Sequence, residues 1–266
     1  MGSFTGYLAD LHRSRPAGRG PENLVVVCSI SSTNRLARDI AAEYEREAEP
    51  PPPILLLAHA QSGGRGRQGR SWSSPAGKGV YASRVLTVDG LARLPTLPLL
   101  AGVGLCRALS PHLSAPCRLK WPNDLVVETP AGRRKIGGIL IEALVRAEAE
   151  TRLAAIIGFG INHGHEAGEL PEAGTSVRLL GGGASLGQLT WDLVAGLEAE
   201  LEHLGDMAYA AAAYRGLSVH RPGDLITARS GEEIVEGRFA GFDDSGRLLL
   251  DRDGEELRLT AGEVIE

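Results

Sequence analysis

The stretch that decides the fold comprises residues 54–72 and reads ILLLAHAQSGGRGRQGRSW. Its first four residues are large and apolar, and they predict a buried strand. The glycine-rich loop that follows lets backbone N–H groups approach a ligand, and its arginines offer guanidinium groups to phosphate or carboxylate. Strand and loop together predict an anion site. Taken alone, however, the loop also fits a disordered basic segment or a nucleic-acid-binding patch, and it is neither a Walker A loop nor a dinucleotide fingerprint.

The segments before this stretch predict a strand and a helix. Residues 24–28 form an apolar run that predicts another buried strand. Residues 31–34 are serine, threonine and asparagine, which favour the start of a helix. Leu36, Ile40 and Tyr44 then recur at helical spacing, and the prolines at 50–53 end that helix.

The segments after it predict a mixed sheet with flanking helices. Further strands are expected at residues 80–88, 124–128, 135–143 and 153–161, and helices at 97–113, 189–204 and 207–217. The turn at 130–132 joins two strands directly. Short connections of this kind favour hairpins over a doubly wound parallel sheet, so the fold class is α+β.

The chain divides into three parts by texture. Residues 1–23 have no period and are expected to be an irregular lead-in, and residues 24–216 form the main domain. From residue 217 to 266, short strands alternate with turns at 222–224, 243–246 and 253–254. That texture predicts a small antiparallel barrel.

Composition excludes several classes of protein. The net charge of −5 argues against non-specific nucleic-acid binding, and no apolar run is long enough to span a membrane. Cys28, Cys106 and Cys117 are sparse and lie in apolar stretches, so we expect core thiols in a cytoplasmic protein without a leader peptide. Only three of the 28 basic residues are lysines, which directs attention to Lys78, Lys120 and Lys135, although chance also explains any one of them.

Two further motifs carry candidate chemistry. Residues 120–124 (KWPND) form a stiff turn from which Asp124 can hold magnesium or orient a lysine, although Asn-Asp alone is also an ordinary turn signal. Lys135 opens a strand whose glycines are expected to leave room for a substrate. Residues 158–162 (GFGIN) end a strand with two glycines and an amide, which suits a ligand or a bulge. His163 and His165 follow as loop histidines without a third metal ligand.

Together these segments resemble the biotin protein ligase family. The family's arginine-rich glycine loop is similar to residues 64–72, its Lys-Trp-Pro-Asn-Asp element to 120–124, its lysine strand to 135–140 and its Gly-x-Gly-Ile-Asn to 158–162. The Ser-Thr-Asn triplet stands at 32–34. The resemblance implies a catalytic domain like that of class II aminoacyl-tRNA synthetases over residues 24–216 and an SH3-like barrel over 217–266. No DNA-binding segment is visible, so the resemblance is to the monofunctional type.

The resemblance also implies substrates, a metal and a set of roles. Biotin and ATP would form biotinyl-5'-AMP with Mg²⁺, and biotin would then pass to a lysine of a biotin carboxyl carrier protein domain. The implied biotin-binding residues are Ser32, Thr33, Asn34, Gln61, Gly64, Arg65, Gly66, Arg67, Lys135 and Gly137. The implied residues for ATP and the adenylate are Arg65, Arg67, Arg70, Trp72, Lys120, Asn123 and Asn162. The implied catalytic residues are Lys135, Arg67 and Asp124, of which Asp124 is also the magnesium ligand.

Two other functions stay open at this point. A lipoate ligase has a similar catalytic domain, but it needs a longer apolar tunnel and lacks this arginine loop. A biotin-sensing regulator without enzyme activity would be expected to carry a basic helix-turn-helix segment. For Trp72, a place beside adenine and a place in the core are both open, and a homodimer through an exposed sheet edge is a further hypothesis.

Overall fold

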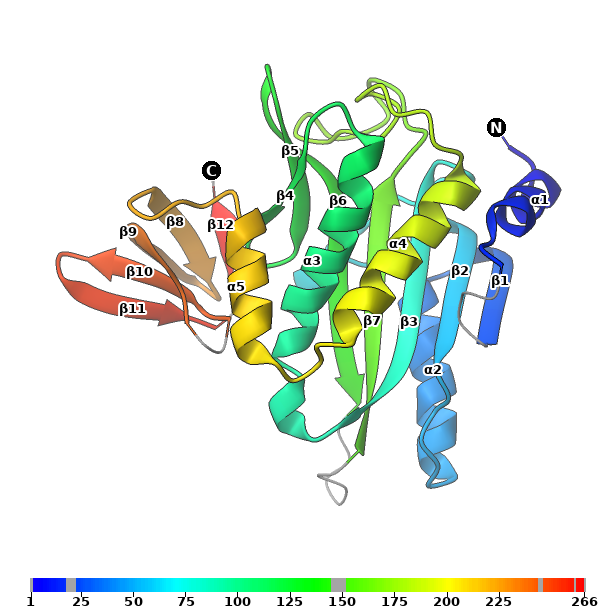
Figure 1. The fold of residues 1–266 in the computed structure, drawn as a ribbon, viewed down its shortest axis with the longest axis horizontal. Helices are drawn as coiled ribbons and strands as arrows, with labels where there is room; N and C mark the ends of the chain where they lie inside the picture. Colours follow the sequence, from blue (N-terminus) through cyan, green and yellow to red (C-terminus); the bar gives the residue numbers. More distant parts are fainter. Residues whose placement is uncertain (1, 18–22, 145–151, 244–245, 261, 266) are drawn as a thin grey trace.

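A seven-stranded mixed sheet forms the centre of the protein (Figure 1). The computed structural model describes residues 2–17, 23–144, 152–243, 246–260 and 262–265. The strand order is β1-β2-β3-β7-β6-β5-β4, with β1 parallel to β2 and the other neighbours antiparallel. The strands are β1 (Asn23–Ile30), β2 (Ile54–Gln61), β3 (Gly79–Asp89), β4 (Cys117–Lys120), β5 (Asp124–Thr129), β6 (Gly132–Leu144) and β7 (Arg152–Asn162). The predicted mixed sheet and the hairpin at 130–132 are confirmed.

Helices cover the two faces of the sheet unequally. On one face lie α3 (Thr96–Leu109), α4 (Leu186–Leu201) and α5 (Met207–Leu217), which bury the larger apolar core (Figure 1). On the other face α2 (Thr33–Arg46) packs against strands β2, β3 and β7 and buries a smaller core. Much of the second face, over β5 and β6, is therefore left without a helix. That is where the candidate site lies.

Burial along the strands follows their place in the sheet. Strand β2 and the central strand β7 are buried almost throughout, because each has neighbours on both sides and helices on its faces. The prediction of a buried strand at 24–28 is wrong in its burial: β1 is an edge strand with its residues half-buried or exposed, and Cys28 is exposed. Cys106 and Cys117 are buried, as expected. No residue range was predicted for the short strand β4, which ends just before the turn at Pro122.

The expected irregular lead-in contains a helix, so that prediction is also corrected. Helix α1 (Phe4–Ser14) begins after Ser3, whose side chain accepts a hydrogen bond from the Gly6 N–H. Tyr7 and Leu11, four residues apart, are buried on one face of the helix. The helix packs beside α4. A helix this short is stabilised by that tertiary contact rather than by its local sequence. Met1 and residues 18–22 lie outside the described residues.

The last strands form a second, smaller sheet. Its order is β11-β10-β9-β8-β12, all antiparallel, over β8 (Leu225–Ser230), β9 (Glu233–Phe242), β10 (Leu248–Arg252), β11 (Glu255–Leu259) and β12 (Glu263–Ile265). This is the predicted antiparallel, SH3-like element. Residues 244–245 of one predicted turn lie outside the described residues.

The small sheet shares its core with the main domain. Phe242 meets Tyr214 of α5 in an edge-to-face contact with ring centroids 5.2 Å apart, and the Val219 N–H donates to the carbonyl of Leu119 on β4 at 2.9 Å. Helix α5 ends at Leu217, next to the predicted boundary, which stays a prediction. Across the described part of the chain, no helix is long and apolar enough to cross a membrane.

Candidate functional site

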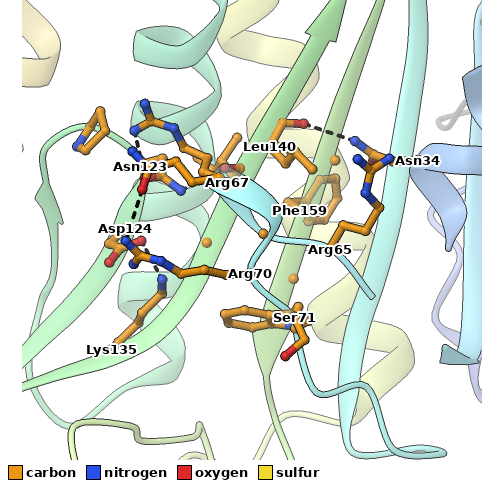
Figure 2. A pocket seen from close by; sticks show the side chains of 18 of the residues that line it. Asn34, Arg65, Arg67, Arg70, Ser71, Asn123, Asp124, Lys135, Leu140 and Phe159 are labelled. Atoms are coloured by element: carbon orange, nitrogen blue, oxygen red, sulfur yellow. Dashed lines mark hydrogen bonds and ion pairs between the residues drawn. The ribbon is translucent and has the colours of Figure 1, made fainter. Parts of the chain in front are cut away.

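A cavity lies over strands β5, β6 and β7, beneath the glycine-rich loop, and is partly open to solvent (Figure 2). The predicted residues that line it are Ser32, Thr33, Asn34, Gln61, Arg65, Gly66, Arg67, Arg70, Trp72, Lys120, Asn123, Asp124 and Lys135. Segments from five places in the sequence therefore meet around one cavity.

Hydrogen-bonding groups of Thr33, Asn34 and Gln61 line one end of the cavity, where Arg65 also lies. The Gln61 side-chain oxygen Oε1 accepts a hydrogen bond from the Thr33 N–H at 2.8 Å, and the side-chain nitrogen Nε2 donates to the Ser74 hydroxyl at 2.9 Å. The side-chain oxygen Oδ1 of Asn34, at the start of α2, accepts a hydrogen bond from the hydroxyl of Ser83 on β3 at 2.6 Å. Ser83 is fully buried and was not predicted from the sequence. These groups are held in place by one another, which suits recognition of a neutral polar ligand group.

The glycine-rich loop folds back on itself above the sheet. The Trp72 N–H donates to the Gly64 carbonyl at 2.9 Å, and the Gly66 N–H donates to the Arg70 carbonyl at 2.7 Å. A Cβ at Gly64 would collide with the Trp72 carbonyl, so only glycine permits this closure. The chain reverses at Gln68, which adopts a positive φ of 54°. The loop thus presents its arginines from a hairpin rather than from an irregular segment.

Charged groups line the opposite end of the cavity. Lys135 Nζ lies 2.6 Å from Asp124 Oδ1 and 5.5 Å from the centre of the Trp72 ring. Arg67 donates to the Asn123 side-chain oxygen at 3.4 Å (Figure 2). Burial lowers the pKa of Arg67 from its ordinary value, while the nearby carboxylate of Asp124 raises it in part. A cation pair with one carboxylate at this end can bind an anionic substrate and stabilise developing negative charge.

A β-bulge in β6 points Lys135 into the cavity. Val126 of β5 pairs with Lys135 while Leu125 pairs with Gly137, so Ile136 is an extra residue in the ladder. Without it Lys135 and Gly138, three residues apart, would face opposite sides of the sheet. With the bulge both line the cavity, and Ile136 is buried in the core.

The turn before β5 is held from the neighbouring strand. The Trp121–Pro122 peptide bond is cis. The Asn123 amide donates to the Ile139 carbonyl at 2.9 Å, and the Ile139 N–H donates to the Asn123 carbonyl at 3.0 Å. Asn123 and Asp124 therefore stand on a backbone fixed to β6, the strand that carries Lys135.

The small C-terminal sheet closes one side of the cavity. The Gly262 carbonyl accepts from Arg67 Nη1 at 3.2 Å, and the Glu263 carboxylate binds the Arg70 guanidinium with both oxygens. The hydrogen bond from Arg70 lowers the pKa of Glu263 below its ordinary value, and the same bond raises the pKa of Arg70. Two loop arginines are thus anchored by residues about 195 positions away in sequence.

The strand glycines make room for the side chains that pack on them, and three of these glycines also line the cavity. A Cβ at Gly158 would overlap the Asn34 amide, and a Cβ at Gly160 would lie 2.5 Å from Trp72 Nε1. A Cβ at Gly137 would meet the Ile161 side chain. Gly138, Gly158 and Gly160 line the cavity, and Gly138 does so beside the Lys135 side chain. The glycines shape the site through the residues that pack on them.

A magnesium ion would find a small set of oxygen ligands here. Among the described residues there is no group of three or more His, Cys, Asp or Glu side chains able to hold a metal. Mg²⁺ usually needs only one or two carboxylates when substrate phosphates complete its shell. Asp124 and the amide oxygen of Asn123 fit that requirement at the charged end of the cavity.

Comparison with known proteins gives the chain's family. The model of the biotin/lipoate A/B protein ligase family matches residues 26–162, and that of the biotin protein ligase C terminal domain matches residues 225–265. Biotin--[acetyl-CoA-carboxylase] ligase of Mycobacterium tuberculosis is 30% identical over 94% of this chain and 91% of its own length. The chain belongs to the biotin/lipoate A/B protein ligase family.

Other members of this ligase family match over different lengths. The bifunctional ligase/repressor BirA of Bacillus spizizenii is 32% identical over 57% of this chain, and the match spans 43% of that protein. A biotin protein ligase from Aquifex aeolicus, solved in complex with biotin and ATP, superposes with a TM-score of 0.70 at 24% identity over 92% of this chain and 98% of that chain. The last likeness is evidence for the fold.

Three predicted residues of the ligase site do not line the cavity. Gly64 and Gly137 do not border it. Glycine is needed at both positions because a Cβ would collide with the Trp72 carbonyl or with the Ile161 side chain. Asn162 is buried and donates to the Thr175 carbonyl at 3.0 Å, so it braces the loop after β7. Sequence reasoning missed Ser83, Gly262 and Glu263. A serine in an apolar strand was the available signal for Ser83, whereas nothing local marked the other two.

Proposed function

We propose that the chain is an ATP-dependent biotin protein ligase that makes biotinyl-5'-AMP and transfers biotin to a lysine of a biotin carboxyl carrier domain. The observation that carries this proposal is a single cavity with hydrogen-bonding groups of Thr33, Asn34 and Gln61 at one end and Lys135, Asp124 and Arg67 at the other. The two ends suit the neutral ureido group of biotin and the reacting carboxylate and phosphate. The match to a biotin protein ligase C-terminal domain favours biotin over lipoate.

The first half-reaction needs positioned charge and no enzyme nucleophile. A biotin carboxylate oxygen attacks the α-phosphorus of ATP, a new P–O bond forms, and the bond to pyrophosphate breaks. Both reactants are anions, so Lys135 and Arg67 are assigned to hold them together and to stabilise charge on the phosphoryl oxygens. Trp72, which faces Lys135, is assigned to the adenylate. Mg²⁺ held by Asp124 would neutralise charge on the phosphates of bound ATP.

The second half-reaction needs access from outside. The amine of the carrier lysine attacks the acyl carbon of the mixed anhydride, loses a proton, and AMP leaves. The solvent-open mouth of the cavity supports entry of an extended lysine side chain. We place the activity in the cytoplasm, where the free thiols of Cys106 and Cys117, buried next to each other, would remain reduced.

A pyrophosphate exchange assay tests this function. Purified protein is incubated with ATP, Mg²⁺ and either biotin or lipoate, and then with a labelled acid and a carrier domain. Exchange that requires biotin, followed by one labelled lysine on the carrier, is the expected result. Exchange driven better by lipoate would reassign the substrate, and binding of biotin without any exchange would make the protein a sensor rather than an enzyme.

A further inference from the structure

Glu142 on β6 joins three segments beside the end of the cavity that Thr33, Asn34 and Gln61 line. Its Oε2 accepts a hydrogen bond from Asn34 Nδ2 at 2.8 Å. Its Oε1 lies 3.9 Å from Arg65 Nη1 of the glycine-rich loop and 3.8 Å from Arg38 Nη1 of α2. The side chain is 20% exposed, so it is partly shielded from water. One carboxylate therefore faces an amide and two guanidinium groups.

The place of Glu142 on the strand explains how it reaches these groups. Gly138 and Leu140 line the cavity, and alternate residues of a strand share a face, so Glu142 comes next on that face. Its own side chain does not line the cavity, whereas Asn34 and Arg65 both do. Figure 2 shows Arg65 and Asn34 together, at the side of the cavity away from Lys135 and Asp124.

The partners of Glu142 need an external support. Arg65 extends from a hairpin loop and is half-exposed, so its long side chain would otherwise sample several rotamers. The Asn34 carbonyl oxygen is already held by Ser83, and its amide group is held by Glu142 and the Leu140 carbonyl. The sheet is the rigid element, so a carboxylate on β6 can fix both groups before a ligand arrives.

We propose that Glu142 is a positioning residue that orients Asn34 and Arg65 for the acid substrate; this inference rests on the proposed function. It acts through those two residues and does not touch the reacting atoms. Its loss therefore weakens binding of the acid more than it slows the chemistry at the distant charged end. ATP binding and turnover at saturating biotin should change little.

Two substitutions separate the two contacts. Glu142→Gln keeps an oxygen that can accept from Asn34 but removes the charge that faces Arg65 and Arg38. Because ion pairs at this separation and exposure are weak, we expect the KM for biotin to rise about two- to fivefold, with kcat and the KM for ATP near wild type. Glu142→Ala also leaves the Asn34 amide without this acceptor, and we expect a rise of about tenfold or more.

Controls distinguish positioning from general support of the fold. Glu166→Gln removes a carboxylate whose Oε1 lies 3.2 Å from Arg178, outside the cavity, and should leave every constant unchanged. In an Arg65→Gln background, Glu142→Gln should have less effect than in wild type, because the two residues act as a unit.

The outcomes keep the inference and the proposed function apart. A wild-type protein without biotin-dependent pyrophosphate exchange would overturn the proposed function itself. An active wild type whose KM for biotin is matched by both Glu142 variants would overturn the positioning role. A fall in kcat together with an equal rise in the KM for biotin and in the KM for ATP, and a lower melting temperature, would overturn it too. That result would mean that Glu142 only stabilises the fold.

Discussion

At the scale of single residues, Lys135 carries the most specific expectation. Its ammonium pairs with Asp124 at 2.6 Å and faces Trp72, where a larger planar group would have to displace one of them. We expect Lys135→Ala to slow pyrophosphate release about 10²- to 10³-fold, which corresponds to about 3–4 kcal/mol of transition-state stabilisation. Lys135→Arg should also release pyrophosphate slowly, because the planar guanidinium group is larger than the ammonium and directs its N–H groups differently.

The control for Lys135 is another lysine that pairs with a carboxylate. Lys78 lies 3.0 Å from Glu169, away from the cavity, and Lys78→Ala should react at the wild-type rate. Near wild-type rates for Lys135→Arg would remove the geometric argument. Near wild-type rates for both Lys135 variants would remove the residue from the catalytic set.

A second expectation at this scale concerns Gly160, on which the Trp72 indole packs. A Cβ there would lie 2.5 Å from Trp72 Nε1, so Gly160→Ala must displace the ring. Overpacking of this kind costs about 1–3 kcal/mol of the free energy of unfolding. We expect altered tryptophan fluorescence and a higher KM for ATP. Gly164→Ala, whose Cβ has its nearest neighbour at 3.8 Å, is the control, and identical spectra for both variants would contradict the packing argument.

At the scale of elements, the contact between β12 and the glycine-rich loop sets how well the loop is ordered. Glu263 binds Arg70, and this contact depresses the pKa of Glu263. The pKa of the Glu263 carboxyl group is lower in the folded protein than its ordinary value of 4.5. The ionised carboxylate therefore stabilises the contact fully at pH values above 4.5, and this stabilisation is lost as the pH falls through the folded-state pKa. The loop should therefore be docked at neutral pH and released in acid below about pH 4.5.

Hydrogen exchange over residues 62–78 measures that docking. Glu263→Gln should raise exchange in the loop at pH 7 toward the value of an undocked hairpin, and adenylate should lower exchange in both proteins, because the bound anion orders the loop arginines. Glu255→Gln, on the outer strand β11, serves as the control and should leave the loop unchanged. Equal exchange in wild type and Glu263→Gln would mean that the ion pair does not hold the loop.

At the scale of the whole molecule, the two sheets are expected to unfold together. Their apolar residues form one continuous core, in which Phe239 and Phe242 of β9 join Tyr214 of α5. A shared core makes separate unfolding costly, because either part alone would expose it. Urea unfolding followed by tryptophan fluorescence and by far-UV circular dichroism should give one coincident transition. Trp121 packs beside Gly262, next to β12, so a second transition in either signal would reveal independent unfolding of the small sheet.

Local sequence patterns are enough to predict the mixed sheet, the later antiparallel sheet and most of the residues around the cavity. Apolar runs such as Ile54–Leu57 specify strands locally, and the turn at 130–132 specifies a hairpin. The glycine-rich loop and residues 120–124 are contiguous motifs whose chemistry is visible without a fold. Lys135 and Asp124 could likewise be paired in advance by their places on adjacent predicted strands.

Tertiary contacts, in contrast, set which further groups complete the site and which elements lie at the edge of the sheet. Helix α1 is short and is stabilised by packing on α4, and the exposure of β1 follows from its place at the sheet edge. Glu142 and Glu263 reach the loop arginines from distant segments, so their roles depend on contacts between residues far apart in the chain. Such contacts leave no local pattern, because they are set by strand order and by how the small sheet docks on the large one.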